Sequence, residues 1–371
     1  METMKICSSA VTVLEEDIAT VFSHAKTSLD MLAGRSILLT GGAGFLGYLM
    51  AHVLVKIGDE DSREPVNLTI LENFQRGRKP WLDNLVQNSK VRLIEQDISL
   101  GMTPATDDFE YIIHAASIAS PIFYRKNPIE TIDANVNGLR HILEYSRPDE
   151  KKANNVKGVL FFSTSEIYGD PSPEAIPTPE TYRGFVSCTG PRACYDESKR
   201  LGETLCVNFA QQYDVPVSVA RPFNNYGPGL SIRDGRLIPD LARNLFANRD
   251  MVLLSNGRAT RTFCYIGDAV AGYLKVLTHG LRGEPYNIGT DRPEVSVKEL
   301  AEKICLLGKD YFGYSGQIEF GKSSDKDYTV DNPNRRCPNI SKARDHLSYN
   351  PIISLDEGLH RSLVWYRENL I

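Results

Sequence analysis

The chain has 371 residues, of which 42% are hydrophobic and 24% are charged, so it can bury a full core and is long enough for two lobes. Its 42 basic and 47 acidic residues give a net charge of -5, which argues against a nucleic-acid partner because no broad cationic surface is expected. The seven cysteines form no metal-ligand pattern, the first residues show no basic region followed by an apolar core, and no apolar run has bilayer-spanning length. We therefore expect a cytoplasmic protein with reduced thiols, no metal site and no membrane partner.

The first predicted element is an amphipathic helix over residues 11–32. Its apolar residues recur at near-helical spacing and alternate with charged ones such as Glu15, Asp17 and Lys26, which is the pattern of a helix with one buried face. We assign residues 1–33 to an N-terminal helical extension that packs against the body of the protein or against a second subunit.

Residues 34–223 alternate between short apolar strands and helices. Strands are expected at residues 36–40, 68–71, 91–94, 111–113, 158–162 and 217–220, and helices at 45–57 and 129–145. Such alternation favours right-handed crossovers and therefore an α/β fold with a Rossmann-type, doubly wound parallel sheet.

The remaining residues, 224–371, are richer in glycine, proline and short segments. Helices are again expected at residues 267–278 and 297–307. We assign this region mainly to a smaller C-terminal substrate-binding lobe, with some segments returning to the first domain.

A glycine-rich loop follows the first strand and leads into a helix. In this loop Gly41 permits a tight turn, Gly44 lets a phosphate approach, and Gly47 lets the helix meet the strand. The neighbouring Phe45 and Leu46 complete the expected contact with the pyrophosphate of a dinucleotide, which binds at a helix N-terminus.

The end of the second strand indicates which dinucleotide is bound. Glu72 stands there, and its carboxylate can accept hydrogen bonds from the adenosine ribose while repelling a 2′-phosphate, which favours NAD over NADP. Asn73 is a second candidate contact. Arg76 and Arg78 follow closely and could bind a phosphate, so NADP stays open.

Two further motifs carry candidate catalytic groups. Tyr195 and Lys199 lie one turn apart on a helix expected to run to residue 211, where the lysine charge would lower the pKa of the phenol and make it a base. Thr164, Ser165 and Glu166 follow a buried strand at its carboxyl end, where open α/β sheets bind ligands. Each motif alone could instead be an ordinary surface helix or a capping turn.

In this order, the glycine loop, Thr164 and the Tyr195/Lys199 pair resemble the extended short-chain dehydrogenase/reductase family, which contains NAD-dependent epimerases, dehydratases and decarboxylases of nucleotide sugars. The resemblance runs from Gly34 to the C-terminus. It implies that Thr164 holds the sugar hydroxyl that is oxidised, Tyr195 removes its proton, and Lys199 also holds the nicotinamide ribose. It further implies a homodimer formed through residues 129–145 and 195–211, and cofactor contacts at Asp97, Ile98, Ala115, Ala116 and Asn135.

Within this family the segments 163–171, 190–200 and 331–340 most resemble the UDP-glucuronate decarboxylases. The resemblance implies oxidation at sugar C4, loss of carbon dioxide from the 4-keto sugar, and reduction by the same cofactor. Ser165 stands where dehydratases usually carry an aspartic acid and is a poor general acid, whereas Glu166 is available to position water or assist proton transfer at C5. Substrate contacts are expected at Tyr124, Asn224, Arg233, Arg261 and Arg336.

One departure keeps other reactions open. Gly229 stands where these decarboxylases usually carry an arginine, for which Arg233 or Arg236 could compensate, and residues 224–228 resemble those of dehydratases. A nucleotide-sugar 4,6-dehydratase or 4-epimerase is therefore an alternative. A catalytically silent NAD-binding regulatory protein is another, although it would not need an intact Tyr195/Lys199 pair.

Overall fold

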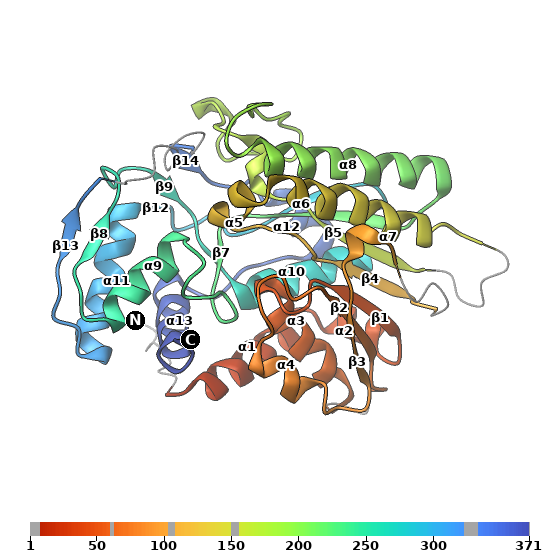
Figure 1. Cartoon of the computed structure of the whole chain (residues 1–371), viewed down its shortest axis with the longest axis horizontal. Helices are drawn as coiled ribbons and strands as arrows, with labels where there is room; N and C mark the ends of the chain where they lie inside the picture. Colours follow the sequence, from red (N-terminus) through yellow and green to blue (C-terminus); the bar gives the residue numbers. More distant parts are fainter. Residues whose placement is uncertain (1–7, 60–62, 103–107, 150–155, 323–332, 371) are drawn as a thin grey trace.

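The computed structural model describes residues 8–59, 63–102, 108–149, 156–322 and 333–370. A parallel sheet lies at the centre between two layers of helices, and a smaller group of strands and helices lies beside the ends of its strands (Figure 1). This arrangement confirms the predicted α/β fold.

In the described part of the chain, seven strands form the central sheet, in the order β11-β6-β5-β4-β1-β2-β3 and all parallel. Their bounds are β1 Ser36–Thr40, β2 Asn67–Glu72, β3 Val91–Glu95, β4 Tyr111–His114, β5 Gly158–Phe162, β6 Val217–Pro222 and β11 Pro285–Ile288. The first six were predicted, and β11 was not. The strand order reverses between β1 and β4, which creates the crevice at the carboxyl ends where such sheets bind ligands.

Helices cover both faces of the sheet. One face carries α3 and α10, and the other carries α7 and α8, each layer with its own apolar core. The predicted helix over residues 129–145 contains a wider π turn, η3, between α6 and α7. Their bounds are α3 Phe45–Lys56, α4 Pro80–Leu85, α5 Pro121–Lys126, α6 Pro128–Asp133, η3 Ala134–Gly138, α7 Leu139–Tyr145, α8 Ala193–Tyr213 and α10 Ile266–His279, and short turns of 3-10 helix are η1 Ile57–Asp59, η2 Ile98–Leu100, η4 Ser165–Tyr168 and η5 Pro173–Ala175.

The smaller group consists of short strand pairs and helices from the C-terminal part of the chain. Strand β7 pairs with β10, β8 with β13, and β9 with both β12 and β14. Their bounds are β7 Asn225–Tyr226, β8 Met251–Leu253, β9 Thr260–Arg261, β10 Cys264–Tyr265, β12 Val295–Ser296, β13 Ile318–Phe320 and β14 Arg335–Arg336, with helices α9 Leu237–Phe246, α11 Val297–Phe312, α12 Ser341–Leu347 and α13 Leu355–Glu368. Between these elements, α10 and β11 belong to the layers of the central sheet.

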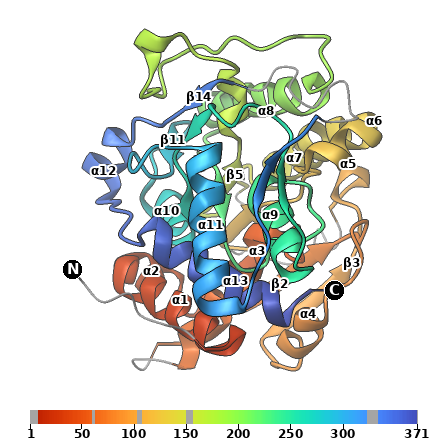
Figure 2. The same cartoon turned by 90° about the vertical axis from the view of Figure 1, so that its left-hand side faces the viewer.

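The N-terminal segment forms two helices, α1 (Ala10–His24) and α2 (Lys26–Leu32), which pack against α10, while α1 also packs against α3 and α13 (Figure 2). The prediction of a single helix was wrong at Ala25, whose φ of -121° and ψ of 27° leave the helical region. The bend lets Leu29 and Leu32 join the core beside α10. Asp17 is buried, and accepts hydrogen bonds from the Tyr265 hydroxyl and from Arg361, both at 2.8 Å.

Candidate active site

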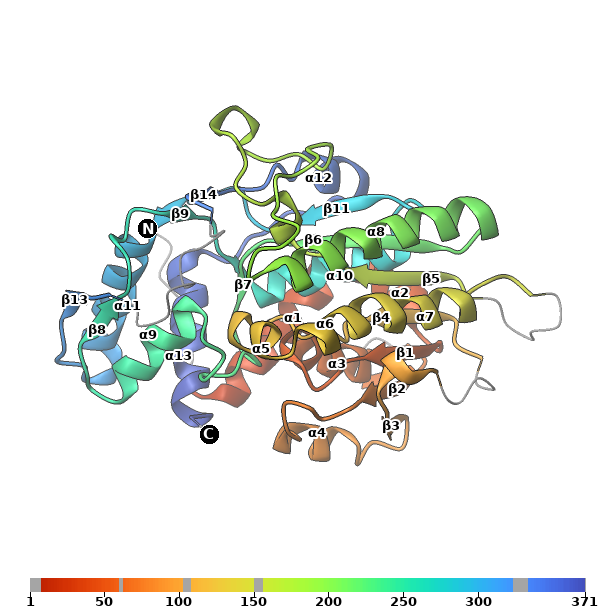
Figure 3. The same ribbon diagram turned by 45° about the horizontal axis from the view of Figure 1, so that its top comes forward.

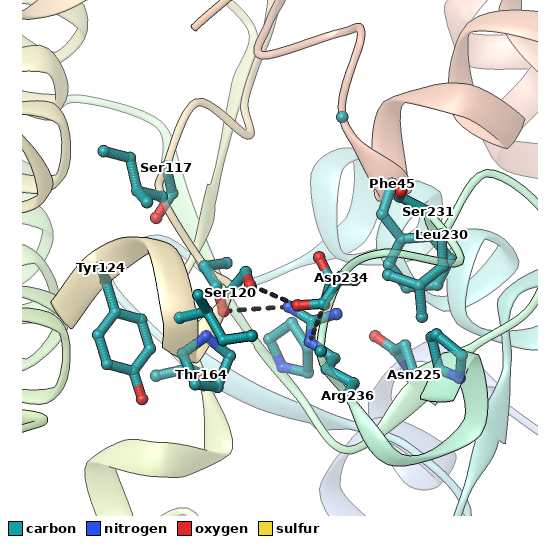
Figure 4. A pocket seen from close by; sticks show the side chains of 18 of the residues that line it. Phe45, Ser117, Ser120, Tyr124, Thr164, Asn225, Leu230, Ser231, Asp234 and Arg236 are labelled. Atoms are coloured by element: carbon teal, nitrogen blue, oxygen red, sulfur yellow. Dashed lines mark hydrogen bonds and ion pairs between the residues drawn. The ribbon is translucent and has the colours of Figure 1, made fainter. Parts of the chain in front are cut away.

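A cavity of about 1290 Å³ opens at the carboxyl ends of the central strands and extends into the smaller group of elements. Figure 4 shows part of it, with Ser120 and Thr164 on one side and Asn225, Asp234 and Arg236 on the other. The described residues that line it include nine arginines and lysines but five aspartates and glutamates. An acidic protein thus presents a locally cationic cavity, which is suited to a phosphate-bearing ligand.

The glycine loop provides the close approach that a pyrophosphate requires. Gly41 has a φ of +69°, and a Cβ there would lie 2.6 Å from the backbone of Ala116. A Cβ on Gly47 would collide with the carbonyl oxygen of Gly42. Gly44 is the N-cap of α3, and no described side chain caps this helix, so its first N–H groups remain available to an anion beside Phe45 and Leu46, which line the cavity.

Glu72 holds the end of β2 against this loop. One of its oxygens accepts from the Ala43 N–H at 3.1 Å, and the other accepts from the N–H groups of Asn73 and Phe74 at 3.1 and 3.2 Å. Burial raises the pKa of Glu72, while the three backbone donors act in the opposite direction. The Asn73 amide donates to the Asp97 carboxylate at 3.1 Å. This acidic rim fits ribose hydroxyls better than a 2′-phosphate.

Arg76 and Arg78, which could have bound the 2′-phosphate of NADP, both have acidic partners in the protein. Arg78 pairs with Asp83 at 2.7 Å. The Arg76 guanidinium lies 3.8 Å from the centre of the Phe123 ring and 3.5 Å from an oxygen of Asp234. Because both guanidinium groups already have acidic partners, the geometry favours NAD.

Asp234 joins the two sides of the cavity. Besides Arg76, it pairs with Arg236 at 3.1 Å, and its backbone carbonyl accepts from the Ser120 hydroxyl at 2.7 Å. Arg236 donates in turn to the Ala119 carbonyl at 3.1 Å. We call Arg76, Asp234 and Arg236 the clasp. It ties the loop before α9 to the loops after β2 and β4, and Figure 4 shows Asp234 and Arg236 beside Ser120.

The other predicted cofactor residues fall into two groups. Asp97, Ile98, Ala115 and Ala116 line the cavity, whereas Asn135 does not. Asn135 is fully buried in the π turn, where it accepts from the Ser117 hydroxyl at 2.7 Å and donates to that of Ser198 at 2.9 Å. It therefore braces the loop after β4 against α8 and does not reach the cavity itself.

Thr164, Tyr195 and Lys199 all line the cavity and are all buried. Lys199 donates to the Phe162 carbonyl at 2.8 Å, and its Nζ lies 5.8 Å from the centre of the Tyr195 ring. Burial raises the pKa of Tyr195 to about 12, against a hydrogen bond with Thr164 and the charge of Arg236, and burial lowers the pKa of Lys199 to about 7. The prediction of a lowered pKa for Tyr195 is therefore wrong for the protein alone, because burial dominates and the opposing influences come from Thr164 and Arg236.

Glu166 is held by two arginines. Arg336 binds both carboxylate oxygens at 2.5 Å, and Arg192 binds one of them as well. Although burial would raise the pKa of Glu166, Arg192 and Arg336 hold it well below its usual range. Glu166 is thus an ionised carboxylate and a poor proton donor, which corrects the expectation that it assists proton transfer. Ser165 is buried beside it in the cavity wall.

Three predicted substrate residues lie on the cavity wall with Arg336. Arg261 is buried and donates to the carbonyls of Thr260 and Asn334 at 2.8 and 3.2 Å. Burial and the neighbouring Arg336 lower the pKa of Arg261 to about 10. Asn224 has a φ of +43° and donates to the Thr262 carbonyl at 2.9 Å.

Tyr124 is the third of these residues and contacts the candidate base directly. Its ring stacks on that of Tyr195, with centroids 5.1 Å apart and an angle of 8° between the planes. Its hydroxyl is buried and has no hydrogen-bond partner among the described residues. Tyr124 thus forms part of the cavity wall beside Tyr195.

In comparisons with known proteins, the model of the NAD dependent epimerase/dehydratase family matches residues 37–289. The chain belongs to this family. It is 36% identical to UDP-glucuronic acid decarboxylase 1 of Arabidopsis thaliana over 90% of this chain and 70% of that one, and 34% identical to the enzyme of the same name from Xenopus tropicalis over 91% and 73%. The crystal structure of UDP-glucose 4-epimerase from Thermotoga maritima superposes with a TM-score of 0.74 at 25% identity, covering 91% of this chain and all of that one. NAD is the cofactor of the family, in agreement with the acidic rim around Glu72.

The structure explains why this family member has glycine at residue 229. Gly229 has a φ of +88°, and a Cβ there would lie 2.5 Å from the Cβ of Tyr48. Tyr48 therefore occupies the space that an arginine side chain would need. Of the two residues that could compensate, Arg236 lines the cavity, whereas Arg233 is exposed and does not. Arg233, which was expected to contact the substrate, thus lies outside the cavity wall.

Sequence reasoning missed several charged residues of the site. Arg192 lies just before α8 and Asp196 one turn later, so their spacing of four residues was a usable signal for a pair. The role of Asp234 had no comparable signal, because its partner Arg76 is distant in the chain. Residues 331 and 332 of the C-terminal motif lie outside the described residues. Among the described residues we find no cluster suited to a metal ion and no helix long and apolar enough to cross a membrane.

Proposed function

We propose that the chain is an NAD-dependent decarboxylase that converts UDP-glucuronate to UDP-xylose. The observation that carries the proposal is the pair of arginines, Arg192 and Arg336, that converge on a carboxylate in the cavity wall. Guanidinium groups bind carboxylates in a bidentate manner, so a substrate carboxylate can compete with Glu166 for them. The relatives named UDP-glucuronic acid decarboxylase act on such a substrate.

The cavity also suits NAD and the nucleotide part of UDP-glucuronate. Its excess of basic residues matches two diphosphates and a carboxylate. The glycine loop and Glu72 fit NAD, and Arg261 would lie on the side of the nucleotide diphosphate. The clasp, which ties the two sides of the cavity together, would keep both ligands in place during several successive steps.

The catalytic residues have distinct roles in this mechanism. Thr164 holds the C4 hydroxyl of the sugar, and Tyr195 Oη takes its proton. NAD, which the glycine loop and Glu72 would hold, would supply a reversible acceptor for the C4 hydrogen and its electron pair, so there would be no net oxidation. Its oxidised nicotinamide is also a cation, which would help to lower the pKa of Tyr195 from about 12.

The carboxylate leaves after this oxidation. The bond between C5 and C6 breaks, carbon dioxide departs, and the electron pair passes into the C4 ketone as an enolate, which then takes up a proton from water at C5. The proton held by Tyr195 finally returns to the C4 oxygen. Arg192 and Arg336 orient the sugar carboxylate before it leaves. When no substrate is bound, the ionised Glu166 keeps the two arginines in position.

A mass-resolved assay with NAD and UDP-glucuronate tests this function. We expect loss of carbon dioxide and a UDP-pentose product, with UDP-glucose left unchanged. Tyr195→Phe should lower turnover by at least about a hundredfold, and Tyr213→Phe, at the far end of the same helix, should not. Loss of water from hexose substrates would identify a dehydratase, and inversion at C4 without loss of mass would identify an epimerase.

We also propose a homodimer in which a second copy covers the face formed by α6 and α8 (Figure 3). Large apolar side chains are exposed on these helices, namely Ile129, Ile132 and Leu201. Sedimentation should show a dimer that Leu201→Lys dissociates, whereas Leu306→Lys on α11, another exposed leucine, should leave it intact. A monomeric wild-type protein would refute the proposal.

We further propose that the enzyme works in the cytoplasm. The described cysteines are all unpaired, as is typical of a reducing compartment, and they are Cys188, Cys194, Cys206, Cys264, Cys305 and Cys337. Fractionation of cells that express the chain would test this, and recovery in a secreted fraction would contradict it.

A further inference from the structure

Asp196 is a buried carboxyl group beside Arg192, one of the two arginines that hold Glu166. It follows Tyr195 on α8 and is 5% exposed. One of its oxygens lies 3.6 Å from Nε of Arg192, and the other is buried with no hydrogen-bond partner among the described residues. Unlike Arg192, it does not line the cavity.

Asp196, Arg192, Glu166 and Arg336 form one connected group, which we call the quartet. Arg192 lies between the two carboxylates, and Glu166 lies between the two arginines. With both carboxylates ionised, the quartet is electrically neutral and has no charge left for a third carboxylate. With Asp196 neutral, the quartet carries one positive charge that the sugar carboxylate can match.

The two carboxyl groups of the quartet are held unequally. Glu166 has bidentate contact with Arg336 and a further contact with Arg192, whereas Asp196 has a single, longer contact with Arg192. The other titratable groups around Asp196 are Tyr195, Tyr124 and Cys194, all of which are neutral at pH 7. Asp196 is therefore the member that gains a proton when negative charge is added.

We propose that Asp196 is a positioning residue that sets the charge of the carboxylate-binding arginines: it takes up a proton from solvent when the acidic sugar binds and returns it once the carboxylate has left. This inference rests on the proposed function. It also gives the site a basis for distinguishing an acidic sugar from a neutral one, because only the acidic sugar drives the uptake.

The direction of the pH dependence follows from the same contacts. Burial, and then the charge of Glu166, raise the pKa of Asp196 to about 7, while Arg192 and Arg336 act in the opposite direction. Above that pH Asp196 is ionised, and its negative charge neutralises the positive charge of the quartet that would otherwise attract the sugar carboxylate. KM for UDP-glucuronate should therefore rise by up to about tenfold between about pH 6 and pH 8.

Calorimetry at pH 7 in two buffers of different ionisation enthalpy measures the uptake. The protein is the NAD-loaded Tyr195→Phe variant, which binds substrate without consuming it. We expect about half a proton to be taken up with UDP-glucuronate and none with UDP-glucose, which lacks the carboxylate. Equal uptake with the two sugars would overturn the proposal.

The variant Asp196→Asn provides the second measurement. It holds the quartet permanently in its positive form, so KM should stay near its low-pH value up to about pH 8. Glu197→Gln removes the same charge from the next residue, outside the cavity, and should keep the wild-type profile. An unchanged pH profile in Asp196→Asn would refute the inference while leaving the decarboxylase intact. Failure of UDP-glucuronate to bind at all would instead overturn the proposed function, and this inference with it.

Discussion

Replacing Gly229 by alanine tests the explanation for the missing arginine. The residue has a φ of +88°, and an L side chain in this region costs about 1–2 kcal/mol. The new Cβ would also lie 2.5 Å from the Cβ of Tyr48, and forcing an extra carbon into packed surroundings costs about 1–3 kcal/mol. We expect Gly229→Ala to lower the free energy of unfolding by about 2–5 kcal/mol.

Urea unfolding of the wild-type protein and of Gly229→Ala, both without ligand, measures this loss of stability. Gly313→Ala is a matched control, because Gly313 has a φ of +67° but no described atom within 4 Å of its ideal Cβ. It should show the backbone cost alone, so the difference between the two variants isolates the contact with Tyr48. If the two variants lose the same stability, the steric reasoning is wrong. Gly229→Arg would be a larger perturbation still, and it should not create the substrate contact expected of an arginine at this position.

Three further predictions concern other parts of the fold. Asp17→Ala should cost about 1–3 kcal/mol in urea unfolding, because it leaves the buried Tyr265 hydroxyl without its acceptor. Arg76→Ala should weaken NAD binding about two- to fivefold in a fluorescence titration, since it removes one partly exposed ion pair of the clasp. Asn135→Ala should cost about 1–3 kcal/mol of stability, because the Ser117 hydroxyl loses its acceptor and the bond to Ser198 is lost as well. It should also lower turnover, because Ser117 lies in a loop that lines the cavity.

Each of these variants has a control or a clear contrary result. Glu15→Ala, exposed on the same helix as Asp17, should change stability by less than about 0.5 kcal/mol. Arg78→Ala should leave NAD affinity unchanged, because Arg78 pairs with Asp83 and takes no part in the clasp. A loss of affinity equal to that of Arg76→Ala would argue against the clasp. Full turnover in Asn135→Ala would exclude its role as a brace.

Most of the sheet could be predicted from the sequence because its central strands are buried on both faces and appear as short apolar runs. Strand β11 could not, because it begins with Pro285 and has four residues, and its place in the sheet depends on pairing with the distant β6. The helix break at Ala25 could not be predicted either, since the helical spacing of apolar residues continues through it. Such features depend on what each segment packs against.

The site shows the same division. Residues within one motif, such as Thr164 or the Tyr195/Lys199 pair, could be assigned because their spacing fixes their relative position. The contact between Glu166 and Arg336 joins residues 170 positions apart, and its effect on the pKa of Glu166 could not be foreseen. The high pKa of Tyr195 likewise reflects burial, which a four-residue spacing does not show.

The packing of the two N-terminal helices matters for anyone preparing shortened versions of the protein. The family match begins at residue 37 and ends at residue 289, so these positions look like natural places to cut. Yet α1 and α13, which lie outside these limits on opposite ends of the chain, pack against each other, and α1 and α2 also cover α10. A chain trimmed to the family limits would expose the apolar surface of α10 and should aggregate, whereas one beginning at Ser8, before the cap of α1 at Ser9, should remain intact.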